Sequence, residues 1–287
     1  PYTKKLFSAS SEQVSFKETN PSKEKLLEVR SISVNYRSHE RGIFSKGKSV
    51  EAVSNVSLDI RKGERLGLVG ESGCGKSTLT RTILGLQSAS SGYIKFEGQE
   101  VSKYANSFKK NIQVVFQDPY GSFNPRQKIG RLITEPFFTL GREAPPETEQ
   151  KIIAQKMLKE VGLSSESIEK YIHEFSGGQR QRIAIARALV IQPKLIIFDE
   201  AVSALDVSIR SQILKLISDL TERYGLSYLF ISHDLTVIEN ITENCLVMKN
   251  GKIVERGQTK HILRDPKNEY TLSLINAAPK FPNFLHA

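Results

Sequence analysis

The residues with the clearest chemical meaning lie between 66 and 78, where an apolar run turns through three glycines into a helix-forming segment. The spacing G-x-x-x-x-G-K-[ST], in the strand-to-helix context that it requires, is met by Gly70, Gly75, Lys76 and Ser77. Glycines let backbone N–H groups approach a phosphate closely, and the positive end of the following helix favours the same anion. The pattern therefore predicts a phosphate-binding loop (P-loop, residues 70–78) for a nucleotide, in preference to a chance glycine-rich turn.

The side chains of the P-loop suggest specific contacts. Lys76 can reach the β- and γ-phosphates of a nucleotide, and the Ser77 hydroxyl can ligate Mg²⁺. The residues expected to touch the nucleotide are Gly70, Glu71, Ser72, Gly73, Cys74, Gly75, Lys76, Ser77 and Thr78. Because a helix N-terminus and Lys76 both favour a thiolate, we expect thiol reagents to modify Cys74 unless Mg·ATP protects it. An ordinary, partly buried thiol is the alternative.

Further polar residues follow predicted strands. Asp199 and Glu200 come directly after the apolar run 195–198, and His233 follows the run 228–231. The carboxyl ends of buried parallel strands are where α/β sheets bind ligands. We therefore expect the two carboxylates to lie near the P-loop.

Other signals place helices and turns. Gln117 ends the apolar run 112–116, which predicts a central strand. Ser176 is a plausible N-cap of a helix that continues to about Leu189, and the first amides of that helix form a second anion-binding end. The pair Asn250-Gly251 predicts the tight turn of a β-hairpin.

The elements change type along the chain. Residues 27–34 and 53–60 alternate between apolar and polar side chains, as half-buried strands do, and 93–101 has the pattern of a hairpin. Tyr36, after the first strand, can stack on adenine or be an ordinary strand-end aromatic. From 121 to 172 the pattern turns helical, which indicates an all-helical insertion in an α/β core.

Length and composition set wider limits. At 287 residues the chain exceeds the usual single-domain size, and it lacks the roughly 18 consecutive apolar residues of a membrane helix. Cys74 and Cys245 are the only cysteines, which suits a reducing cytoplasm and excludes a cysteine-ligated zinc or iron–sulfur site within the chain. The net charge of +10 is compatible with nucleic acid, anionic lipid or nucleotide, but the lysines are scattered, which favours a solvated surface.

Six ordered segments of the chain, between about 26 and 265, resemble the ATPase domain of ABC transporters. They are Gly70–Ser77, Gln117, Phe175–Gln179, Leu195–Glu200, Ser203–Asp206 and His233. The segments 115–119 and 175–182, and the end from Asp265 to Pro279, look most like the oligopeptide, dipeptide and nickel importer family. The departures, Phe175 for leucine and Ala201-Val202 for Pro-Thr, affect no chemical group. Some relatives hold an iron–sulfur cluster in a cysteine-rich tail, and none is expected here.

The resemblance implies an α/β fold. Its parts would be a P-loop NTPase core with a parallel sheet, an N-terminal antiparallel β subdomain, and an inserted α-helical subdomain at about 121–190. The ATPase domain would span 26–265, with a C-terminal extension over 266–287.

The resemblance also implies roles in ATP hydrolysis. Asp199 would hold Mg²⁺, usually through water, and Glu200 would polarise the attacking water as a general base or water-positioning group. Gln117 would touch the Mg²⁺ shell and sense the membrane subunit, and His233 would hydrogen-bond the γ-phosphate. Lys76 would complete this catalytic set. Taken singly, Gln117 is an ordinary polar strand end and His233 an ordinary structural histidine, so their roles depend on the family order.

Residues 176–179 form what we call the signature segment. They resemble the family segment that caps the γ-phosphate bound to the opposite ATPase domain: Ser176, Gly177, Gly178 and Gln179. The resemblance thus implies ATP sandwiched between two ATPase domains, with Asp206 at their interface.

The expected function is that of the ATP-hydrolysing subunit of an ABC importer for peptides or a related small solute. It would be peripheral, at the cytoplasmic face of the inner membrane, docked on two permease subunits and served indirectly by an extracytoplasmic solute-binding protein. Gln117 and the loop 118–126, including Tyr120 and Phe123, would form the coupling surface. The alternative is a non-transport ABC ATPase acting on nucleic acid or ribosomes. The zinc cysteines, coiled coils or interdomain arm of that class are missing, so no nucleic acid is expected.

The start of the chain suggests a longer arrangement. Residues 1–9 echo the segment 270–277, a type of tail that normally follows an ATPase domain. We therefore expect 1–25 to be the tail of a preceding domain plus a linker, which would make this chain the second half of a tandem ATPase. A coincidence between short polar helices is the alternative.

Overall fold

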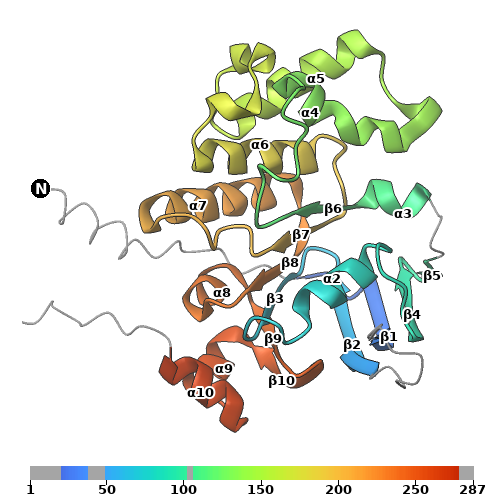
Figure 1. Ribbon diagram of the computed structural model, residues 1–287, viewed down its shortest axis with the longest axis vertical. Coiled ribbons are helices and arrows are strands. Elements are labelled where there is room, and N and C mark those ends of the chain that lie inside the picture. Colours follow the sequence, from blue (N-terminus) through green and yellow to red (C-terminus); the bar gives the residue numbers. More distant parts are fainter. Residues whose placement is uncertain (1–20, 38–48, 102–105, 278–287) are drawn as a thin grey trace, which may run out of the picture.

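The computed structural model describes residues 21–37, 49–101 and 106–277. Two β-sheets occupy one end of its long axis and a helical layer the other (Figure 1). Residues 1–20 lie outside the described chain, and so does the predicted tail of a preceding domain.

The larger sheet has six strands in the order β10-β9-β3-β8-β7-β6. Their bounds are β3 (Arg65–Val69), β6 (Ile112–Val115), β7 (Leu195–Asp199), β8 (Ser227–Ser232), β9 (Asn244–Lys249) and β10 (Lys252–Gln258). All neighbours pair in parallel except β9 and β10, which are antiparallel. The P-loop strand β3 therefore lies in the middle of a parallel core, as expected.

Both faces of this sheet are covered. Every residue of β7 and β8 is buried. Along β7, Ile196 and Phe198 join the core on the helical side, whereas Leu195 and Ile197 join the core on the side of the second sheet. This alternation explains why both strands are apolar throughout, since a strand that faces two cores has no solvent side.

The prediction of a central strand at 112–116 is wrong in position. Among the described strands β6 pairs with β7 alone, so it forms the edge of the sheet. Its apolar residues are explained by the layers above and below, because Ile112 packs in one core and Val115 in the other.

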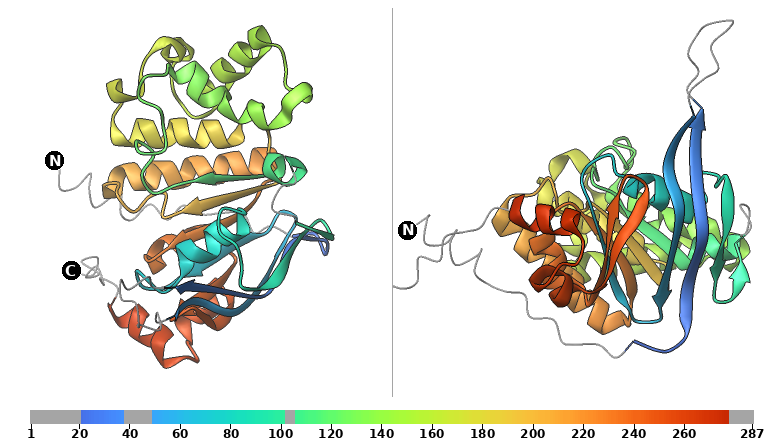
Figure 2. Two further views of the ribbon diagram at one scale, coloured as in Figure 1. Left: turned by 45° about the vertical axis from the view of Figure 1, so that its right-hand side comes forward. Right: turned by 90° about the horizontal axis from the view of Figure 1, so that it is seen from below.

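The second sheet is antiparallel, in the order β2-β1-β4-β5. It consists of β1 (Lys25–Arg37), β2 (Ser49–Arg61), β4 (Ser91–Phe96) and β5 (Gln99–Glu100). The strands β1 and β2 run side by side over their whole length (Figure 2). Their inward side chains share a core with Leu79 and Ile83 of helix α2 (Lys76–Ile83), which fixes the P-loop helix between the two sheets. The antiparallel β subdomain is confirmed.

Helices form the remaining layers. The region from 129 to 189 contains α4 (Ile129–Thr134), η1 (Glu135–Glu143), α5 (Glu147–Glu160), η2 (Ser165–Glu169), η3 (Ile172–Glu174) and α6 (Gly177–Leu189). Helix α7 (Val207–Tyr224) lies between this layer and the sheet (Figure 1). The inserted helical subdomain is thus present. The remaining helices are α3 (Asn106–Asn111), α8 (Leu235–Ile241), α9 (Thr259–Arg264) and α10 (Glu269–Ala277). Among the described residues, no helix is both long and apolar enough to cross a bilayer.

Candidate functional site

A cavity of about 780 Å³ lies at the carboxyl ends of β3, β6 and β7. The P-loop, the start of α2, residues 116–118, and Asp199 with Glu200 line it. The predicted phosphate loop and the predicted carboxylates are therefore brought together, as the parallel order of the strands requires.

Neighbouring backbones explain two of the P-loop glycines. A Cβ on Gly70 would lie 2.3 Å from the carbonyl oxygen of Met248, and one on Gly75 would lie 2.4 Å from that of Ala52. Gly75 also has φ 111°, a conformation that favours glycine. In addition, the Gly251 N–H donates to the Cys74 carbonyl at 2.8 Å. The loop is thus held between strand β2 and the β9–β10 hairpin.

Lys76 turns back into this loop. Its side chain is 4% exposed, and its ammonium donates to the carbonyls of Gly70 at 2.7 Å and Glu71 at 3.0 Å. The Nζ atom also lies 3.7 Å from Oε1 of Glu200. The Lys76 ammonium therefore lies between the carbonyls of the loop and the carboxylate of Glu200.

Asp199 and Glu200 differ in setting. Burial, with the nearby Glu200 charge, raises the pKa of Asp199, while Lys76 and Arg81 oppose that shift. Glu200 follows the end of β7 with φ 51°, a left-handed conformation that costs energy for a side chain other than glycine. Its N–H donates to the Ile231 carbonyl at 3.0 Å, which ties this turn to β8.

These groups suit Mg²⁺. The Asp199 carboxylate, the Ser77 hydroxyl and the Gln117 amide line the same cavity and offer the oxygen donors that the ion prefers. Among the described residues no group of three or more His, Cys, Asp or Glu could hold a metal alone. A magnesium ion here would therefore take its other ligands from water and phosphate, as this ion usually does.

His233 approaches the same carboxylate from β8. Its Nδ1 atom lies 3.4 Å from Oε2 of Glu200, and half of its side chain is exposed. Glu200 therefore lies between Lys76 and His233. This contact is the structural support for a histidine that the residue order alone left ambiguous.

The loop after Gln117 is attached to helix α6. Arg187 donates to the Ser122 carbonyl at 2.9 Å and lies 4.3 Å from the Phe123 ring centroid. Arg180 lies 4.8 Å from the ring centroid of Tyr120. Phe123 is 5% exposed and belongs to the core, so the expectation that it offers a docking surface is wrong. Tyr120, at 44% exposure, keeps that possibility.

Tyr36 lies beside the P-loop helix. It is 39% exposed, and its hydroxyl is 3.4 Å from Oγ1 of Thr78. Strand β1 therefore brings an aromatic ring to the edge of the site, and stacking on adenine stays a prediction.

The signature segment lies apart from the cavity. Ser176 caps α6, accepting from the Gln179 N–H, while the Gln179 side chain accepts from the Ser176 N–H. Ser176, Gly177 and Gln179 are exposed, and within the described chain none of the four signature residues lines the cavity. A Cβ on Gly178 would lie 2.5 Å from Cγ2 of Ile209, so the packing of α6 on α7 also requires this glycine. No pattern in the sequence indicated that Gly178 must be small in order to pack against Ile209.

The setting of Cys74 favours the alternative of an ordinary buried thiol over a reactive one. Its side chain is 7% exposed, and burial raises the pKa of its thiol in spite of Lys76. The helix terminus and the lysine were both visible in the sequence, but the packing of Cys74 in the core was not.

Sequence reasoning also missed two residues at the site. Arg81 of α2 lines the cavity. Tyr270, in the predicted C-terminal extension, accepts a hydrogen bond from the Glu71 N–H at 3.1 Å. A partner 199 positions away could not be inferred from local spacing.

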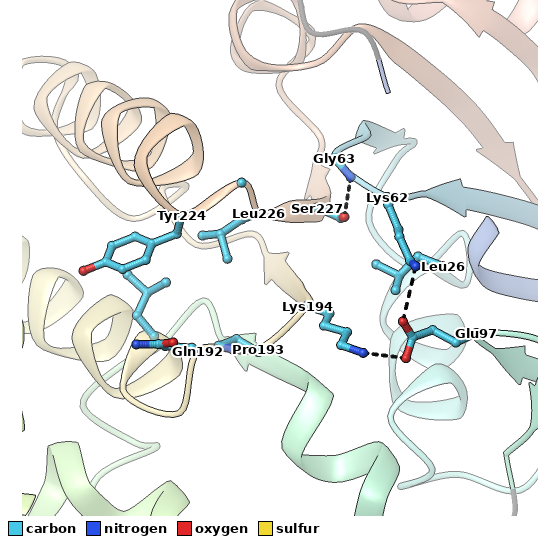
Figure 3. A pocket seen from close by; sticks show the side chains of 12 residues that line it. Leu26, Lys62, Gly63, Glu97, Gln192, Pro193, Lys194, Tyr224, Leu226 and Ser227 are labelled. Atoms are coloured by element: carbon cyan, nitrogen blue, oxygen red, sulfur yellow. Dashed lines mark hydrogen bonds and ion pairs between the residues drawn. The ribbon is translucent and has the colours of Figure 1, made fainter. Parts of the chain in front are cut away.

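A second cavity, of about 410 Å³, lies at the opposite ends of β7 and β8 (Figure 3). Lys194 contacts Glu97 there at 2.6 Å, and Lys62 lies 3.7 Å from the same carboxylate. Its charges are thus paired with one another, and the glycine-rich loop is at the other end of the sheet. This cavity does not correspond to the predicted phosphate site.

Comparisons with known proteins agree with this geometry. The family described as ABC transporter matches residues 53–203. The dipeptide transport ATP-binding protein DppF of Haemophilus influenzae is 42% identical over 271 residues, which are 92% of this chain and 82% of that protein. The oligopeptide transport ATP-binding protein AppF of Bacillus subtilis is 45% identical over 267 residues, 91% of this chain and 80% of that protein. The dimeric ATP-binding cassette MJ0796, solved with ADP and Pi, is similar in structure with a TM-score of 0.71 and 26% identity, over 82% of this chain and 99% of that one.

Proposed function

This chain belongs to the ABC transporter family, and we propose on that premise that it is the ATP-hydrolysing subunit of an importer for peptides or a related small solute. The observation that carries the hydrolytic part of the proposal is the contact of Glu200, which lines the P-loop cavity, with both Lys76 and His233. The similarity to dipeptide and oligopeptide transport ATP-binding proteins supports the importer part.

Binding of ATP would use the P-loop. The backbone N–H groups at the start of α2 and the Lys76 ammonium would hold the β- and γ-phosphates, and Tyr36 would stack on the adenine. Ser77, Asp199 and Gln117 would hold Mg²⁺, which when bound supplies neutralisation of the phosphate charge.

Hydrolysis would use the carboxylate of Glu200. It would orient a water and take its proton as the oxygen attacks the γ-phosphorus and the bond to the β–γ bridging oxygen breaks, giving ADP and inorganic phosphate. His233, at 3.4 Å from Glu200, would hold that carboxylate and hydrogen-bond the γ-phosphate.

A second ATPase domain would complete the site. The signature segment is exposed and lies away from this chain's own cavity, so it is available to the phosphates of a partner. The relative MJ0796 is described as a dimer, which supports this arrangement. Two permease subunits, docked at Tyr120 and the other exposed residues of the 117–126 loop on the cytoplasmic face of the membrane, would complete the importer together with a solute-binding protein.

Reconstitution tests the proposal. The chain and its permease subunits would be placed in vesicles and supplied with binding protein, labelled di- and oligopeptides, and ATP. We expect peptide uptake that requires ATP and is lost in Lys76→Ala, since this substitution removes the phosphate-binding cation. Peptide uptake that proceeds equally without ATP would contradict the proposal. ATP hydrolysis without peptide uptake would exclude a peptide as the transported solute.

A further inference from the structure

The C-terminal extension reaches the P-loop through one side chain. Tyr270 lies in the first turn of α10 and is 6% exposed. Its hydroxyl oxygen accepts the backbone N–H of Glu71 at 3.1 Å. Burial raises the pKa of the phenol above its ordinary value. The nucleotide-binding roles proposed above leave this contact unexplained.

The contact continues to the catalytic lysine. The carbonyl of the same Glu71 accepts the Lys76 ammonium at 3.0 Å and the Cys74 N–H at 3.3 Å. Residue 71 is therefore held at its N–H by Tyr270 and at its carbonyl by Lys76. The first turn of the P-loop owes its position to both partners.

Tyr270 is itself held in place by the β9–β10 hairpin. The Glu255 carboxylate on β10 accepts the N–H groups of Lys267 at 2.9 Å and Asn268 at 3.3 Å. The Asn268 side chain then accepts the Tyr270 N–H at 2.9 Å. The ammonium of Lys249, at the end of β9, lies 4.4 Å from the centroid of the Tyr270 ring. Four residues around Tyr270 thus direct its hydroxyl to the P-loop.

We propose that Tyr270 is a positioning residue that holds the first turn of the P-loop, so that docking of α10 on Glu255 sets the affinity for a nucleoside triphosphate. The inference rests on the proposed function, in which this loop binds ATP. A loop already held in its binding conformation loses less conformational freedom when the phosphates bind. Without the hydroxyl, the Glu71 N–H has no partner in the folded loop, and the loop relaxes.

The test is Tyr270→Phe in the full chain, which keeps the ring beside Lys249. Titration with a fluorescent ATP analogue in Mg²⁺ should show a Kd raised about three- to tenfold, the value of one neutral hydrogen bond. The kcat at saturating ATP should stay within about twofold, because the hydroxyl does not touch the reacting groups. Tyr93→Phe is the matched control, since Tyr93 is exposed and also has a lysine 5.2 Å from its ring centroid. It should leave Kd unchanged.

A double-mutant cycle tests the route through Glu255. Glu255→Ala should raise Kd, and adding Tyr270→Phe should raise it little further, because both act on one contact. Additive effects would overturn the role of α10 docking, and wild-type affinity in Tyr270→Phe would overturn the inference. If Tyr270→Phe does not fold, Glu255→Ala alone decides, and an unchanged Kd overturns the inference. A wild-type chain that does not bind ATP would instead refute the proposed function.

Discussion

The P-loop and the signature segment both turn through glycines into a helix, and both place backbone N–H groups at a helix N-terminus. Their surroundings differ. The P-loop is pressed between the backbones of β2 and β9, and it shares a cavity with a buried lysine and two carboxylates. The signature segment is exposed, and its buried glycine faces the side chain of Ile209.

A helix N-terminus therefore becomes a chemical site only through the elements that surround it. The P-loop has its phosphate-binding cation, and Glu200 and His233 lie within contact distance of one another. Within the described chain no signature residue lines that cavity, so under the proposed function the segment is half of a site that a second domain completes. The following substitutions test this contrast.

Glu200→Gln, in the P-loop cavity, should have the largest effect on ATP hydrolysis. The substitution keeps the size of the side chain and removes the proton acceptor, so ATP hydrolysis should fall about 100- to 10,000-fold. ATP affinity should change little, because it rests on residues 70–78. Phosphate release and ATP-analogue titration measure the two quantities. Near wild-type turnover in the assembled transporter would remove Glu200 from the mechanism.

Gly177→Asp, in the signature segment, should have the second-largest effect on ATP hydrolysis. A Cβ at Gly177 meets nothing within 4 Å among the described residues, and an acidic residue suits the first turn of a helix, so the fold should persist. The new negative charge would face the partner's γ-phosphate, and we expect ATPase activity of the assembled complex to fall roughly 10- to 100-fold. The isolated chain should bind ATP as before. A matching loss of its ATP affinity would show that the segment acts within its own chain.

Gly178→Ala should act on stability. The added Cβ would collide with Ile209, so α6 and α7 must shift, at a cost of about 1–3 kcal/mol in the free energy of unfolding. Urea denaturation measures this cost, and adding Ile209→Ala should recover part of it by removing the colliding methyl group. If Gly178→Ala is as stable as wild type, packing against Ile209 does not require this glycine, and binding of the partner's phosphate remains as its explanation.

Asp199→Asn should have the smallest effect on the stability of the ligand-free protein, and the size of that effect depends on pH. Because the pKa of Asp199 is raised in the folded state, the stability it contributes is complete below its unfolded value of about 3.9 and is lost as the pH rises through the folded value. At pH 7 the ionised carboxylate thus costs stability. Asparagine should therefore stabilise the ligand-free protein at pH 7, and stabilise it less near pH 4.

Thermal unfolding between pH 4 and 7 provides the measurement. The same variant should lose the extra stabilisation that Mg²⁺ gives over ATP alone, because it lacks the carboxylate ligand. A Mg²⁺ effect equal to that of wild type would exclude Asp199 as a ligand.

The sequence by itself determined the local parts of the site. The glycine spacing identified the P-loop, the acidic pair after 195–198 identified the carboxylates, and Ser176 identified the start of α6. The turn at Asn250-Gly251 also follows from its residues, which adopt φ 46° and 78°. Each of these features is set within a few residues by backbone conformation, capping or side-chain period, so local sequence suffices to predict it.

The tertiary structure decided which distant residues meet. It moved β6 to the edge of the sheet, buried Cys74 and Phe123, and gave Gly178 a packing partner. It also brought the Tyr270 hydroxyl to the Glu71 N–H, across 199 positions of chain. Such contacts depend on strand order and on how the layers pack, and a single sequence encodes neither in any local period.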